Sequence, residues 1–208
     1  MFRNILSPDN PLMITMNQIT DCIFLSLFWL LGCFPVVTAG ASFAALYDAT
    51  YRRFRKGEKH PWQRFLKVFR ENWKAGIVPT VVFYIGGYAL VKAMVGIWNA
   101  AVYGQISWML FAAGAFVGVL ALGILSVLFP MLSRFENPTG ALIKNTVFLA
   151  MANVPKTLGL GLVNAVSFFL CLRFVAPIFF LPALAALIGS LFVEPMFKPF
   201  LPEEEATN

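Results

Sequence analysis

Charged side chains are scarce in this 208-residue chain: Asp, Glu, Lys and Arg make up 12% of it, about half the share in an average soluble domain. Histidine occurs once, at His60, and no cluster of Asp and Glu supports a metal site or an acid–base pair. A P-loop, a glycine-rich dinucleotide turn and a serine elbow are also missing. We therefore expect a protein that is not an enzyme and that binds no metal and no cofactor.

Cysteine is scarce as well, with three residues at Cys22, Cys33 and Cys171. Three is an odd number, and the spacing matches no metal-binding motif. Each cysteine lies inside an apolar run, where a free thiol behaves as a small hydrophobic side chain. We expect all three to be packing residues.

Apolar residues are abundant, at 59% of the chain. Several runs approach or exceed the roughly 20 residues that a helix needs to cross a bilayer. We predict an all-α, polytopic helical membrane protein with one membrane domain over residues 1–208, about five transmembrane helices and short amphipathic helices between them. The predicted spans are 13–34, 75–100, 106–129, 157–172 and 174–193.

Prolines mark several of these boundaries. We expect Pro35 to close the first span and Pro130 to end the third. Pro155 is expected to stop a short apolar helix before the fourth span. Pro177 and Pro182 are expected to bend the fifth span.

Basic residues are concentrated in the loop 52–74, which contains nine of the sixteen in the chain. The nine are Arg52, Arg53, Arg55, Lys56, Lys59, Arg64, Lys67, Arg70 and Lys74. Such a cluster between spans is retained on the cytoplasmic side. We expect this loop, the segment 131–156 and the tail with Glu203–Glu205 to be cytoplasmic, and the uncharged turn 99–105 to lie outside. The excess of basic residues in cytoplasmic loops and the attraction of anionic lipid headgroups explain the net positive charge of the chain better than nucleic-acid binding does. We do not expect nucleic-acid binding.

The segment Pro61–Lys74 has the period of an amphipathic helix. Its apolar face carries Trp62, Phe65, Leu66, Phe69 and Trp73. Tryptophan on one face and cations on the other are typical of a helix in the lipid interface. We expect a basic surface that contacts anionic headgroups, formed by Arg64, Lys67, Arg70 and Lys74. The alternative is that the apolar face packs on the protein's own helices.

The segment Val36–Tyr51 is apolar but short. Sixteen helical residues reach about 24 Å, less than the roughly 30 Å hydrocarbon core. We expect a helix at the cytoplasmic face. The alternative is a tight helical hairpin at Pro35, which would place the N-terminus inside.

Asp21 and Lys92 are the charged residues that lie deepest in predicted spans. At 1.5 Å per residue, each lies about 12 Å below the outer interface. Ionisable residues at such depth are costly, and they usually pair or line a cavity. We predict an intramembrane ion pair between Asp21 and Lys92. The alternative is that Lys92 extends toward the headgroups while Asp21 caps a backbone group or stays protonated.

Several segments occur in the order and spacing of a known family. They are Cys33–Ala41, Phe65–Lys74, Arg134–Asn137 and Asn153–Thr157. In these segments the chain resembles the YesL-like family of bacterial integral membrane proteins, a domain of unknown function. The resemblance implies a multi-pass protein of the bacterial cytoplasmic membrane. Members are often encoded beside carbohydrate ABC importers, so it also implies importer subunits as partners.

Two functions are compatible with these observations. The first is a non-catalytic accessory component associated with carbohydrate uptake or glycan utilisation. The second is a small secondary transporter or channel for a small solute. A transporter is expected to have polar groups that converge near the membrane midplane. The third predicted span is entirely uncharged, which favours the accessory function.

Overall fold

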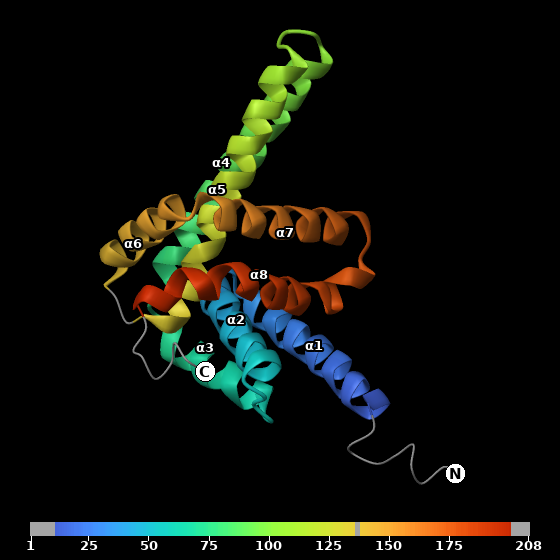
Figure 1. Ribbon diagram of the computed structural model, residues 1–208, viewed down its shortest axis with the longest axis vertical. Coiled ribbons are helices and arrows are strands. Elements are labelled where there is room, and N and C mark those ends of the chain that lie inside the picture. Colours follow the sequence, from blue (N-terminus) through green and yellow to red (C-terminus); the bar gives the residue numbers. More distant parts are fainter. Residues whose placement is uncertain (1–10, 136–137, 201–208) are drawn as a thin grey trace.

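The computed structural model describes residues 11–135 and 138–200, and all regular structure within them is helical (Figure 1). The helices are α1 (Pro11–Cys33), α2 (Ala39–Arg55), α3 (Pro61–Asn72), α4 (Ile77–Val102), α5 (Trp108–Arg134), α6 (Thr139–Ala152), α7 (Val154–Arg173) and α8 (Leu181–Phe197). Short 3-10 helices occur at η2 (Val36–Thr38), η3 (Ala176–Phe179) and η4 (Lys198–Phe200). The tail with Glu203–Glu205 and residues 136–137 of the segment 131–156 lie outside the described residues.

Five helices are long and apolar enough to cross a membrane. They cover Thr15–Cys33, Ile77–Val102, Trp108–Arg134, Val154–Arg173 and Leu181–Phe200. The longest of them have 26 and 27 residues, or about 40 Å of helix, which exceeds the hydrocarbon thickness. The predicted all-α fold with five potential spans is confirmed.

Prolines mark different boundaries from those that the sequence predicts. Pro130 does not end α5, because it lies inside a helix that continues to Arg134. Pro155 and Pro182 lie in the first turns of α7 and α8. The first turn of a helix tolerates proline because its amide groups have no intrahelical partner. Pro155 therefore starts a helix instead of stopping one.

The fifth predicted span, 174–193, is displaced toward the C-terminus. Its first residues form a connection that includes η3, and the long helix begins only at Leu181 and continues to Phe197. The break lies upstream of the helix, so α8 itself is not bent at Pro182.

Helix α2 lies at the centre of the protein and packs against α1, α3, α5 and α8. Eleven of its seventeen residues are buried, and most of these are small. After Cys33 the chain turns through η2 and α2 runs back along α1, which is the hairpin alternative at Pro35. The segment is thus an interior helix of the protein, and its position at the cytoplasmic face of the membrane stays a prediction. Gly57, with φ of 70°, adopts the left-handed conformation that follows many helix ends.

Helices α4 and α5 form a long hairpin that projects from the other helices as an arm (Figure 1). In the same view α7 and α8 run across this arm, so the five long helices do not form one parallel bundle. Trp98 and Trp108 pack edge to face at the tip, with ring centroids 6.3 Å apart. The tip includes the uncharged turn 99–105, and aromatic side chains of this kind favour a membrane interface.

The arm is joined to α7 at a close crossing of glycines. A Cβ atom on Gly161 would overlap the carbonyl oxygen of Val119 in α5. A Cβ atom on Gly123 would overlap the carbonyl oxygen of Thr157 in α7. Only small residues allow two helix backbones to approach so closely.

Candidate functional site: a buried charge cluster

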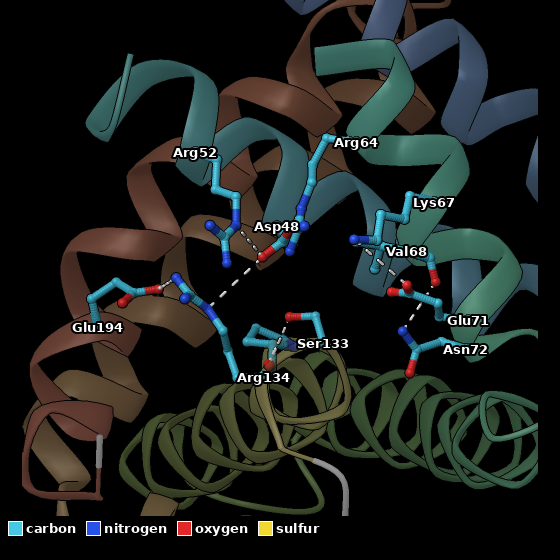
Figure 2. Close-up of polar contacts among 11 residues, drawn as sticks. Asp48, Arg52, Arg64, Lys67, Val68, Glu71, Asn72, Ser133, Arg134 and Glu194 are labelled. Carbon is cyan, nitrogen blue, oxygen red and sulfur yellow. Dashed lines mark hydrogen bonds and ion pairs between the residues drawn. The ribbon is translucent and has the colours of Figure 1, made fainter. Parts of the chain in front are cut away.

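Asp48 is a fully buried carboxylate in the middle of the helical core, with 0% of its surface exposed. Its Oδ1 accepts a hydrogen bond from Nε of Arg52, one turn further along α2, at 3.2 Å. Its Oδ2 accepts a short hydrogen bond from Nε of Arg64 on α3. Figure 2 shows the carboxylate between these two arginines. The carboxylate therefore fastens α3 to α2.

Arg134, the last residue of α5, connects this carboxylate to a second one. Its Nε lies 4.0 Å from Oδ1 of Asp48, and its Nη2 donates to Oε1 of Glu194 on α8 at 2.9 Å. Its guanidinium lies 4.5 Å from the centroid of the Tyr51 ring, a cation–π distance. The side chain of Arg134 is only 4% exposed. It links the ends of α5 and α8 to α2.

Tyr47 completes the cluster on the side of α8. Its hydroxyl donates to Oε1 of Glu194 at 2.8 Å. Burial, and then the neighbouring Glu194 carboxylate, raise the pKa of Tyr47 well above its ordinary value. Tyr47 therefore stays neutral and remains a hydrogen-bond donor.

We call this set of residues the Asp48 cluster; it consists of Tyr47, Asp48, Tyr51, Arg52, Arg64, Arg134 and Glu194. Three arginines alternate with two carboxylates, so positive charge exceeds negative charge by one. Buried charges are tolerated when they are paired and hydrogen-bonded, and loss of one partner is strongly destabilising. The polar groups contact one another across four helices, which suits the cluster to holding α2, α3, α5 and α8 together.

The sequence alone does not reveal this cluster. The sequence pattern places Arg64 at the lipid surface, and it places Arg134 and Glu194 in polar segments outside the predicted spans. One local signal was present. Asp48 is the only acidic residue between Asp21 and Glu58, and Arg52 follows it at i+4, the spacing of an ion pair on a helix.

Asp21 and Lys92 do not form the predicted pair. Asp21 Oδ2 accepts a hydrogen bond from Arg53 Nε at 2.5 Å. Lys92 is exposed, and its Nζ lies 5.6 Å from the centroid of the Tyr88 ring. The predicted pairing rests only on the equal depth of the two residues in their predicted spans. In the structure α2 runs back along α1 and places Arg53 opposite Asp21.

We expect Asp21→Asn and Arg53→Gln to be coupled in a thermal-unfolding cycle by about 1.5–3 kcal/mol, the range for a hydrogen bond between charged groups. The Lys92→Met substitution serves as the control. It should change the unfolding free energy by no more than about 0.5 kcal/mol, and its effect should add to that of Asp21→Asn. Additive effects of the Asp21 and Arg53 substitutions would contradict this pairing.

The predicted basic helix is observed as α3, and its apolar face is divided between two environments. Phe65 and Val68 are buried against the core, as expected for internal packing. Trp62, Leu66 and Trp73 remain exposed. Internal packing and an outward apolar stripe therefore coexist on this helix.

The four cations of the basic surface are divided in the same way. Arg64 points inward to Asp48, whereas Lys67, Arg70 and Lys74 are exposed beside the apolar stripe. Lys67 makes only a loose ion pair with Glu71, at 3.9 Å. The three outer cations are thus available for lipid headgroups, and Arg64 has a structural role.

We expect a peptide covering residues 59–74 to bind anionic vesicles more tightly than neutral ones. Replacement of Lys67, Arg70 and Lys74 by Gln should weaken binding to anionic vesicles by about 1 kcal/mol per charge, because each cation interacts with the negative surface potential. Binding to neutral vesicles, through the tryptophans, should change little. Tryptophan fluorescence during a lipid titration measures both. Equal binding of the unsubstituted peptide to anionic and neutral vesicles would disprove the interfacial interpretation.

Two hollows are lined almost entirely by apolar side chains. One lies between α4 and α5 along the arm. The other lies between α1, the end of α2, and the beginning of α8 with the residue Phe180 before it. Within residues 11–135 and 138–200, no three His, Cys, Asp or Glu side chains come together in a group that could hold a metal ion.

Comparison with known proteins relates part of the chain to a family. A model of the family described as "Protein of unknown function, DUF624" matches residues 22–92. The matched part contains Asp48, Arg52 and Arg64, while Arg134 and Glu194 lie beyond it. No curated protein and no solved structure matches the chain significantly. Over less than half of its length, then, the chain is similar to a family whose function is unknown.

Proposed function

We propose that this protein is a non-catalytic, multi-pass membrane protein that acts as an accessory component in carbohydrate uptake or glycan utilisation. The Asp48 cluster is the observation that carries the non-catalytic part of this proposal, and the resemblance to the YesL-like family supports the part on carbohydrates. A catalytic or transport site directs polar groups toward a cavity that receives the substrate. Here both oxygens of Asp48 accept hydrogen bonds from arginines, and Arg134 bonds to Glu194. The hollows described above are apolar, which also favours a role other than solute binding.

We propose subunits of a carbohydrate ABC importer as the partners. The resemblance to the YesL-like family supports this class of partner. The arm supports association within the membrane, since its outer part presents apolar side chains to its surroundings. Val91 and Val95 on α4, and Phe116 and Val117 on α5, are at least half exposed. Such a surface is suited to contact with lipid or with helices of another membrane protein.

We also propose that the protein lies in the bacterial cytoplasmic membrane with the loop 52–74 inside and the turn 99–105 outside. Cysteine at Gln105, in a background without the three native cysteines, should react with a membrane-impermeant maleimide in intact cells. Cysteine at Glu58 should react only after the membrane is opened. The reverse pattern would overturn this orientation.

Two measurements separate the accessory function from a transporter. Deletion of the gene should lower uptake of a radiolabelled oligosaccharide through the importer, and a plasmid copy should restore it. Proteoliposomes that contain only this protein should take up no more sugar than empty liposomes. Flux through the purified protein alone would establish the transporter alternative, and unchanged uptake in the deletion strain would refute the accessory role.

The arm can be tested for partner contact with a photo-reactive amino acid. At Val91, which is 51% exposed on α4, it should crosslink to an importer membrane subunit. At Val127, which is fully buried in α5, the same group should give no crosslink to another protein. The same group can also be placed at the exposed position Val95. If both positions crosslink only to lipid, the arm faces the bilayer and contacts no partner.

A further inference from the structure

The hollow between α1, α2 and α8 is an apolar groove on the outside of two potential membrane helices. We call it the α1–α8 groove. It is lined by Thr15, Gln18, Ile19, Cys22, Ile23, Phe54, Phe180, Leu184 and Leu187. Since α1 and α8 are both long and apolar enough to lie in a membrane, the chemistry of this groove fits an acyl chain.

A cationic group lies beside this apolar wall. Arg53 precedes the groove residue Phe54, and its Nε donates to Asp21, which precedes the groove residue Cys22. The side chain of Arg53 is 22% exposed, so part of it is accessible. Arg55 and Lys56 follow Phe54 and are exposed at the end of α2. An apolar groove and a positively charged helix end are therefore adjacent.

The guanidinium of Arg53 retains donors for a further ligand. Arginine has five N–H donors. One is bonded to Asp21, and Nη1 lies 3.5 Å from the carbonyl oxygen of Glu58. The contact with Asp21 holds the planar group in place, and a planar group with paired donors is well suited to phosphate oxygens.

From these observations we propose that the α1–α8 groove binds one anionic phospholipid molecule. One acyl chain lies against Ile19, Ile23 and Leu184, and the phosphate accepts hydrogen bonds from Arg53. The charge of the helix end selects an anionic headgroup over a zwitterionic one. This lipid site is independent of the proposed role in carbohydrate uptake, because it would stabilise the protein whatever its partners are.

The test uses the full-length protein in detergent and measures the rise in unfolding temperature on addition of lipid. Dioleoyl phosphatidylglycerol should raise this temperature more than dioleoyl phosphatidylcholine or oleate. Ile19→Trp, which fills the groove, should abolish the difference between the two phospholipids. Val91→Trp is the matched control, because Val91 is similarly exposed on another long helix outside the groove. This control should respond to phosphatidylglycerol as the unsubstituted protein does.

A second pair of variants tests the phosphate contact. Arg53→Gln should reduce the effect of phosphatidylglycerol to that of phosphatidylcholine. Asp21→Asn should keep the selectivity, because the amide oxygen of asparagine can still accept the hydrogen bond that holds Arg53 in place. If Arg53→Gln does not fold, native mass spectrometry of Ile19→Trp and Val91→Trp tests the site instead. Val91→Trp should retain bound phosphatidylglycerol, and Ile19→Trp should not. The proposal would be overturned if phosphatidylglycerol stabilised the unsubstituted protein no more than phosphatidylcholine does, or no more than oleate does. It would also be overturned if Ile19→Trp kept the full difference between the two phospholipids.

Discussion

Asp48→Asn is expected to lower the free energy of unfolding by about 3–5 kcal/mol, the cost of removing one partner from a buried ion pair. The substitution leaves Arg52 and Arg64 without the carboxylate that they share. The side chains of Arg52 and Arg64 are 26% and 20% exposed, whereas the carboxylate that they share is fully buried. Arg134 keeps its bond to Glu194. Most of the loss should therefore come from the contact with Arg64, because it joins α3 to α2, whereas Arg52 lies on the same helix as Asp48.

The double substitution Asp48→Asn with Arg64→Gln should recover much of this loss, because no unpaired charge remains between α2 and α3. Thermal or denaturant unfolding of the four proteins in one detergent measures the coupling. Glu71→Gln is the control, since it removes an ion pair that is 62% and 56% exposed, and it should change stability by less than about 1 kcal/mol. An effect of Asp48→Asn no larger than that of the control would contradict the proposed role of the cluster.

Gly161→Ala is expected to destabilise the protein by about 1–3 kcal/mol through overpacking. The new methyl group would overlap the carbonyl oxygen of Val119, so α5 and α7 would have to move apart. Alanine favours a helix over glycine by about 1 kcal/mol, which offsets part of the loss. A backbone carbonyl has little room to move, so the overlap should dominate.

Gly96→Ala is a control with the opposite expected sign. Gly96 lies in α4 with no neighbouring atom within 4 Å of an added Cβ, so alanine should stabilise the helix by about 0.5–1 kcal/mol. Unfolding temperatures of both variants in the same detergent give the comparison. Stabilisation by both substitutions would show that the glycine crossing does not limit how closely α5 and α7 approach.

The fold was predictable from the sequence because its strongest signals are local. Runs of about 20 apolar residues define the long helices, and the 3.6-residue period of Pro61–Lys74 defines α3. The ends of the helices were less predictable, because proline is compatible with both the end and the first turn of a helix. Pro130 lies within a helix and Pro155 begins one, and only the packing around each residue decides between these outcomes.

The Asp48 cluster was not predictable in the same way, because its members come from helices that are distant in the sequence. Glu194 lies 60 residues from Arg134 and 147 from Tyr47. The pairing of Asp21 failed for the same reason. Depth in a span was inferred from the sequence, but the neighbour of Asp21 was decided by the turn at η2, which brings α2 back along α1.

The central claim is that the Asp48 cluster holds the helices together and performs no chemistry. The most direct measurement is sugar uptake by the deletion strain complemented with the Asp48→Asn/Arg64→Gln protein, at a membrane level and unfolding temperature matched to the unsubstituted protein. We predict that uptake is restored, because the double variant keeps the helix packing and lacks only the charges of Asp48 and Arg64. A double variant that assembles and unfolds normally but restores no uptake would contradict the account, since the charges themselves would then be needed for function.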